Sequence, residues 1–312
     1  MRDYIVKRLF QGLLVVLAVS ILIFALMQIM PGDPIDLMTD SKVSEERKDQ
    51  MRQKWGLDKP VYVQYFVWLT NILQGDFGTS IKSKQDVGDM LEQRIPMTLK
   101  LIGTATLIRF VLSVPLGLLS AFKKDKLIDQ LLMLFAAVTN AIPAFCGGIL
   151  MILLFGVKLK WLPLSGYETP RHFIIPIAAL VLSSMAEMMR LTKTEVLDVY
   201  KEKYVQTAYA KGLRAGAVRT RHVLRNAMIP IVVMLFLTIP WIIGGGVIIE
   251  NIFVIPGMGN LLYQGIVDQD FPVVQACILI IAILTVLCNL FGDIVTAMLD
   301  PRIKVEMSGG KA

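Results

Sequence analysis

The sequence predicts an all-α membrane protein with six membrane-spanning helices. Hydrophobic residues make up 55% of the 312 residues and charged residues 18%, whereas charged residues average about 25% in soluble domains. The mean hydropathy is +0.61. Six apolar stretches are each long enough to cross about 30 Å of hydrocarbon as a helix. They are residues 8–30, 97–121, 130–157, 173–192, 227–250 and 272–298.

The first stretch resembles the start of a secretory signal but is too long to be one. It follows the basic segment MRDYIVKR and stays apolar to Met30, with no small-residue cleavage site before MPGDP. A signal peptide has an apolar region of about 7–15 residues. We therefore expect an uncleaved first span.

Residues 31–95 form the one long connection, between the first two spans. Amphipathic spacing predicts two short helices in it, over 45–55 and 61–73. This organisation predicts a first span with an extracytoplasmic cap in residues 1–94 and a transmembrane core in residues 95–298.

The distribution of lysine and arginine predicts that both termini are cytoplasmic. Eighteen of these residues lie in the N-terminal segment, the loop after the second span, the loop 190–225 and the tail 299–312. The short loops on the opposite side hold three. The net charge of +7 therefore reflects membrane topology and not binding to nucleic acid, and we expect a multi-pass protein of the cell (inner or plasma) membrane.

Four spans contain a proline, at Pro115, Pro143, Pro176 and Pro240. Proline in a membrane helix frees backbone groups that other helices or water must satisfy. Either the bundle is built to bend at these points, or the prolines reflect the ordinary frequency of proline in spans.

Four polar residues at membrane depth are candidates for a substrate pathway: Arg109, Asn140, Glu187 and Asp293. Ionisable residues are costly inside a bilayer and usually mark function or a buried pair. We expect Arg109 either to pair with Glu187 or Asp293, or to contact substrate.

The sequence lacks the motifs of an enzyme. It has no nucleotide-binding P-loop, no zinc-protease motif and no serine-hydrolase motif. The two histidines, His172 and His222, are too few and too far apart for a histidine-based metal site, and the three cysteines lie in apolar stretches. We predict no catalytic residue, no metal ligand and no cofactor bound by this chain.

The segment EKYVQTAYAKGL, residues 202–213, is a polar island in the basic loop. As a helix it places Val205, Ala208, Tyr209 and Gly212 on one face, and Lys203, Gln206, Thr207, Ala210 and Arg214 on another. Glycine inside a helix costs about 1 kcal/mol, so we expect Gly212 to end the helix or to mark a contact. The pattern alone fits either an ordinary loop helix or a docking surface.

This loop resembles the signature loop of ABC-transporter membrane subunits, and the chain resembles the first permease of the dipeptide, oligopeptide and nickel importer family. The resemblance covers nearly the whole chain. Its motifs are MQIMPGDP, GLDKPVYVQYFVWL, GDFGTS, YVQTAYAKGL with RHVLRNAMIP, WLPLSGY, ENIFVIPGMGNLL, DFPVVQ and LDPRI. Gln206 and Thr207 replace the Glu-Ala of the general loop pattern and Arg225 replaces its proline, as in the peptide subfamily. Cys146 stands where that family often has a bulky aromatic residue.

The resemblance implies the type I ABC importer permease fold and a set of partners. These are a second homologous permease, two cytoplasmic ATPases that bind ATP and Mg²⁺, an extracytoplasmic substrate-binding protein and the lipid bilayer. It implies a coupling helix that docks on the ATPase, formed by Tyr204, Val205, Gln206, Thr207, Ala208, Ala210, Lys211, Gly212 and Leu213. The implied function is import of short peptides by alternating access. Import of nickel or a metal chelate is the alternative within the family, and a stand-alone pore or scaffold is the alternative from another class.

Overall fold

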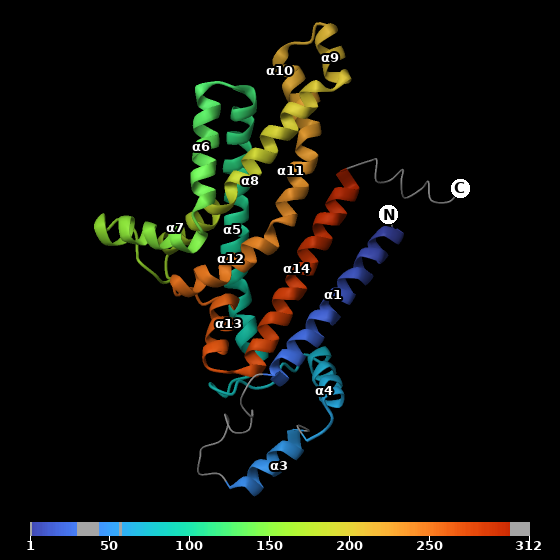
Figure 1. The fold of residues 1–312 in the computed structure, drawn as a ribbon, viewed down its shortest axis with the longest axis vertical. Coiled ribbons are helices and arrows are strands. Elements are labelled where there is room, and N and C mark those ends of the chain that lie inside the picture. Colours follow the sequence, from blue (N-terminus) through green and yellow to red (C-terminus); the bar gives the residue numbers. More distant parts are fainter. Residues whose placement is uncertain (1, 30–43, 56–57, 300–312) are drawn as a thin grey trace. The chain divides into compact units, whose positions relative to one another are not determined.

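Every regular element of the protein is a helix in the part of the chain that the structure, a computed structural model, describes: residues 2–29, 44–55 and 58–299. The first half contains α1 (Arg2–Ile29), α3 (Glu45–Trp55), α4 (Val61–Leu73), α5 (Val87–Phe122), α6 (Leu127–Ala141), α7 (Ala144–Met151) and η1 (Ile152–Lys158). The second half contains η2 (Pro170–Phe173), α8 (Ile174–Lys201), α9 (Lys203–Ala210), α10 (Ala215–Ala217), η3 (Val218–Leu224), α11 (Arg225–Leu237), α12 (Ile239–Ile252), α13 (Met258–Val267) and α14 (Phe271–Leu299). Figure 1 shows these elements along the chain.

The predicted spans correspond to long apolar helices, with one difference. Among the described residues, five helices are long and apolar enough to cross a membrane, and a sixth span results if one bent pair is counted. The two predicted short helices are confirmed as α3 and α4. The PGDP turn and most of the tail 299–312 lie outside the described residues.

The stretch 130–157 is not one straight helix, because the chain turns by 97° between α6 and the pair α7 and η1. Ile142 is extended (φ −98°, ψ 117°), and Pro143 is the N-cap residue just before α7. The proline ring disfavours the helical conformation of the residue before it, so the helix stops at Ala141. Pro240 similarly stands at the start of α12, whereas Pro115 lies inside the uninterrupted α5.

The chain forms two compact units. The first contains Met1–Gln11, Leu99–Ile255 and Leu287–Ala312, and the second contains Gly12–Thr98 and Pro256–Val286. These units are defined by which residues contact one another. Their limits differ from the predicted boundary between the N-terminal span with its cap (1–94) and the transmembrane core (95–298), and that boundary stays a prediction.

In the first unit, α8 is the central helix and packs against α6, α7 and α11. Helix α5 approaches α8 closely at Gly117, where a Cβ atom would lie 2.7 Å from the backbone oxygen of Met189. This close approach leaves no room for a larger residue. Within this unit, α9 and α10 lie at one end and α7 and α12 at the other (Figure 1).

In the second unit, the carboxylate of Asp270 holds the loop before α5. Asp270 is 3% exposed and accepts hydrogen bonds from the Ser80 hydroxyl (2.5 Å), the Ile81 N–H (3.0 Å) and the Lys82 N–H (3.3 Å). Beside it, Lys82 forms a more exposed ion pair with Asp268 at 3.2 Å. Hydrogen bonds to a buried charged acceptor are stronger than exposed ion pairs.

We expect Asp270→Ala to destabilise the protein by roughly 2–3 kcal/mol, because buried donors lose a charged acceptor. Asp268→Ala removes a neighbouring carboxylate of the same size and should cost less than about 1 kcal/mol, because its ion pair is exposed to solvent. Thermal denaturation of the purified protein in detergent measures both. Equal shifts for the two variants would contradict this role of Asp270.

Candidate functional site

Helix α9 is anchored by one face. Val205 and Ala208 are buried in an apolar cluster with Val196 of α8 and with Val218 and Val223 of η3. The remaining positions of α9 are exposed: Lys203, Tyr204, Gln206, Thr207, Tyr209 and Ala210. The helix is therefore fixed to the end of α8 and presents its other side to the surroundings.

Gly212 lies just beyond the last turn of α9. Of the two expectations for Gly212, that it ends the helix or that it marks a contact, the structure confirms the first. The Leu213 N–H donates to the Ala208 carbonyl (3.3 Å) and the Gly212 N–H to the Tyr209 carbonyl (2.9 Å). This pair of bonds is a Schellman motif, which needs a residue in the left-handed conformation. Gly212 has φ +77°, and a Cβ atom there would meet nothing within 4 Å. Glycine is thus favoured here by backbone conformation and not by lack of space.

The structure divides the two predicted faces differently from the sequence. Val205 and Ala208 are internal, but Tyr209 and Gly212 of the same predicted face are exposed. The other candidate positions, which include Lys211 and Leu213, are exposed as well. A partner can therefore meet every candidate residue of this segment except Val205 and Ala208.

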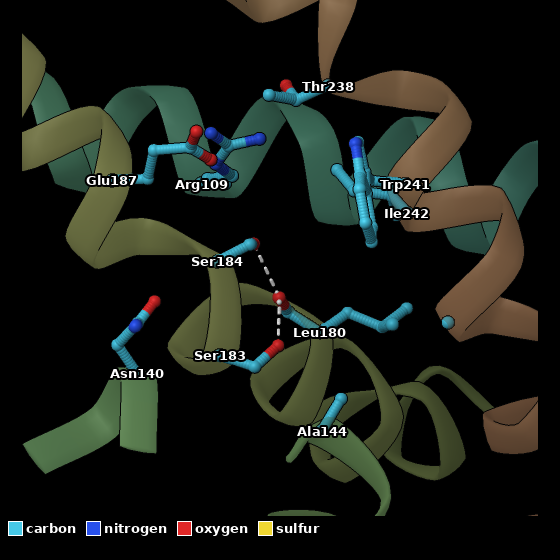
Figure 2. Close-up of a pocket in the computed structure, with 11 residues that line it drawn as sticks. Arg109, Asn140, Ala144, Leu180, Ser183, Ser184, Glu187, Thr238, Trp241 and Ile242 are labelled. Atoms are coloured by element: carbon cyan, nitrogen blue, oxygen red, sulfur yellow. Dashed lines mark hydrogen bonds between the residues drawn. The ribbon is translucent and has the colours of Figure 1, made fainter. Parts of the chain in front are cut away.

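A cavity of about 220 Å³ lies in the first unit among α5, α6, α8 and the α11–α12 junction. Its polar lining consists of Arg109, Asn140, Ser183, Ser184, Glu187 and Thr238. Figure 2 shows these side chains around the cavity, with Trp241 on α12 at its side. The Trp241 side chain is highly exposed.

Arg109 is the unusual member of this lining. It is fully buried, and none of its three guanidinium nitrogens has a hydrogen-bond partner among the described residues. The Glu187 carboxylate acts on it electrostatically and points toward it in Figure 2. Buried polar groups are nearly always hydrogen-bonded. Within the described ranges, the N–H groups of this guanidinium are an exception, and they are available to bind another group.

Three of the four predicted pathway residues meet at this cavity: Arg109, Asn140 and Glu187. Asp293 does not line it. Its carboxylate forms an ion pair with Arg8 at 3.1 Å, so Asp293 joins α1 to α14. Of the two predicted partners of Arg109, the structure therefore brings only Glu187 near it.

The sequence interpretation missed Ser183, Ser184, Thr238 and Trp241. The two serines stand four and three residues before Glu187, which places them on the same face of a helix. That spacing could have identified them. Thr238 and Trp241 reach the cavity because the chain breaks between α11 and α12, and the residues themselves carry no comparable signal.

Comparison with known proteins gives consistent matches along the chain. Residues 113–305 match the family described as binding-protein-dependent transport system inner membrane component, and residues 1–102 match the N-terminal component of the same system. The oligopeptide transport system permease protein AppB of Bacillus subtilis is 39% identical, over 97% of this chain and 100% of that protein. The glutathione transport system permease protein GsiC of Escherichia coli K12 is 36% identical, over 98% of this chain and 100% of that protein.

A solved structure shares the fold. The inward-facing MetNI methionine ABC transporter contains a chain that superposes with a TM-score of 0.58 at 17% identity. The match covers 68% of this chain and 96% of that chain. At this identity the likeness concerns the fold alone, and it agrees with the expected type I importer permease fold.

Proposed function

The chain belongs to the family of inner membrane components of binding-protein-dependent transport systems, and from this premise we propose that it carries short peptides into the cell as one permease of an ATP-driven importer. Relatives that align with nearly its whole length are named as oligopeptide and glutathione permeases. This extended similarity is the observation that carries the peptide assignment.

The exposed side of α9 is proposed as the surface that docks on a cytoplasmic ATPase. Support comes from its anchoring, because Val205 and Ala208 join α9 to α8 and η3. A push on the exposed side would move α8 as well, and α8 carries the cavity residues Ser183, Ser184 and Glu187. Such a linkage suits alternating access, in which ATP binding and hydrolysis on partner chains drive the permease.

The orientation proposed for this surface is cytoplasmic, with both termini on the same side. Nine lysines and arginines lie within residues 190–225, which is the pattern of a cytoplasmic loop. The proposed partners are two ATPases, a second homologous permease and an extracytoplasmic binding protein. ATP and Mg²⁺ belong to the ATPases, because this sequence has no P-loop motif.

Peptide is preferred to nickel as the substrate because the two relatives described above are named for oligopeptide and glutathione. Within the described residues, no group of three or more His, Cys, Asp or Glu side chains could hold a metal ion. Membership in a binding-protein-dependent family also favours an importer subunit over a stand-alone pore or scaffold.

Two measurements test this function. First, the tagged chain expressed in its native membrane should co-purify with ATPase subunits and a second permease. Second, the complex in proteoliposomes should take up a labelled short peptide only with ATP and the binding protein present. Uptake of Ni²⁺ but no peptide would transfer the assignment to metal, and passive flux without ATPase partners would establish a pore.

A further inference from the structure

One buried face of α5 carries three polar side chains that find no hydrogen-bond partner in the described part of the chain. Thr106, Arg109 and Ser113 are all buried, and their side-chain hydroxyl and guanidinium groups have no hydrogen-bond partner among the described residues. Their spacing of three and four residues places them on the same side of the helix. A buried cation without hydrogen bonds is costly, so this arrangement requires a compensating role.

Arg109 alone of these three borders the cavity. A guanidinium presents a planar set of N–H donors that matches the two oxygens of a carboxylate. Glu187 supplies an opposing charge, but it forms no ion pair within 4.0 Å of Arg109 in the described structure, where every Arg109 nitrogen lacks a bond. Within the described part of the chain, the N–H donors of Arg109 therefore bond to no protein group.

The hydroxyl groups of the cavity act as hydrogen-bond acceptors, whereas Arg109 supplies donors. Ser183 and Ser184 donate to the Leu180 carbonyl at 3.1 and 2.7 Å, and Thr238 donates to the Met234 carbonyl at 2.9 Å. Figure 2 shows the two serine bonds. With their protons used by the helix backbone, these oxygens can only accept further hydrogen bonds. The cavity thus combines a donor-rich cation with several acceptors.

We propose that this cavity receives the carboxyl-terminal residue of the transported peptide, with Arg109 binding its free carboxylate. This inference rests on the proposed function and names the group that the permease recognises. A hydroxyl oxygen of the cavity accepts a hydrogen bond from the single backbone N–H of the same residue. At about 220 Å³ the cavity is smaller than the roughly 300–1,000 Å³ that encloses a drug-sized ligand, which suits the end of a peptide.

The guanidinium nitrogens are covered in this conformation, so a carboxylate reaches them only when a neighbouring side chain turns aside. Glu187 is exposed and carries the charge that repels a carboxylate. It is therefore the side chain expected to turn. Its charge also limits how tightly the carboxylate binds, which favours release after transport.

The test uses the complete complex in proteoliposomes with trialanine and trialanine amide, which differ only at the terminal carboxyl group. The wild-type complex should take up the free acid faster than the amide. In Arg109→Gln this ratio should fall at least about tenfold, as expected for loss of a charge-assisted pair, while uptake of the amide persists. Every variant uses the same binding protein, so its own preference cancels in the comparison.

Matched variants separate recognition from structure. Arg109→Lys keeps the charge and should restore part of the ratio. Lys100→Gln removes a cation from the same helix, where its Nζ lies 4.6 Å from the Phe173 ring centre, and should leave the ratio unchanged. Equal loss of acid and amide uptake in Arg109→Gln would make Arg109 structural and overturn the proposal.

Glu187→Gln tests whether the cavity binds the peptide carboxylate even if the Arg109→Gln complex fails to assemble. Removing the repelling charge should raise the ratio of acid to amide uptake, and an unchanged ratio would overturn the proposal. A wild-type complex that imports neither form contradicts the proposed function itself. A wild-type complex that imports both, with the same ratio in Arg109→Gln, contradicts the carboxylate site alone.

Discussion

Ala210→Trp is expected to reduce ATP-driven peptide uptake at least about tenfold while the chain still inserts and assembles with its second permease. Ala210 lies on the exposed side of α9, the side proposed to dock on the ATPase. A clash worth about 1.4 kcal/mol already weakens an interface tenfold, and a misplaced indole costs roughly 1–3 kcal/mol in a packed contact. Proteoliposome uptake and ATPase activity, measured on the same preparation, should separate: hydrolysis continues without transport.

Three controls define this result. Ala210→Ser keeps the position small and should transport normally. Lys124→Trp places the same bulk at an exposed position in the other basic loop and should have little effect. Ala208→Trp is directed into the buried cluster and should lower stability instead. Normal transport by Ala210→Trp would show that α9 docks by another side or not at all.

A tryptophan at Gly212 would be a less clear test. Gly212 has φ +77°, and a residue with a Cβ atom is strained there by roughly 1–2 kcal/mol. The effect of the bulk would be mixed with distortion of the Schellman motif. Ala210 avoids this because it lies within regular helix.

Asp129→Ala is expected to lower the free energy of unfolding by roughly 2–3 kcal/mol, because it removes a buried charged acceptor from three donors and leaves the partly buried Lys193 without its counter-charge. The Asp129 carboxylate accepts bonds from Lys193 Nζ (2.6 Å), the Ser120 hydroxyl (2.5 Å) and the Asp125 N–H (3.0 Å). These contacts join α6 to α8 and to the end of α5. The side chain of Asp129 is 5% exposed and that of Lys193 21%.

Asp198→Ala is the matched control for this prediction. Asp198 also pairs with a lysine at 2.6 Å, Lys201, but the two side chains are 57% and 75% exposed. Such a surface pair contributes about 0.3–0.5 kcal/mol. The denaturation midpoints of both variants in detergent, followed by tryptophan fluorescence, should therefore differ clearly. A loss for Asp129→Ala no larger than that for Asp198→Ala would contradict the buried-pair role.

The helix in the segment 202–213 was predictable from sequence because its information is local. The composition of residues 202–213, the expected helix and the termination at Gly212 all follow from short-range patterns. Its orientation was not predictable. Tyr209 falls on the same predicted face as Val205, but only Val205 meets a buried cluster, since the cluster consists of residues from other parts of the chain.

The charged residues predicted at membrane depth show the same division between what sequence indicates and what it leaves open. Sequence identified Arg109, Glu187 and Asp293 equally well as charges at membrane depth, yet could not assign their partners. The structure brings Glu187 close to the Arg109 cavity and pairs Asp293 with Arg8. Partners of this kind depend on which helices pack together, and hydropathy does not encode that choice.

The sequence by itself determined the membrane class, the number and length of the apolar segments and the family, because these depend on composition, run length and local motifs. Only the tertiary structure decided that residues 130–157 bend by 97° and that α9 is anchored through Val205 and Ala208. It also decided that Arg109 borders a cavity with no hydrogen-bond partner among residues 2–29, 44–55 and 58–299. The physical reason is that burial and hydrogen bonding are properties of contacts between distant segments, which form only when the helices pack.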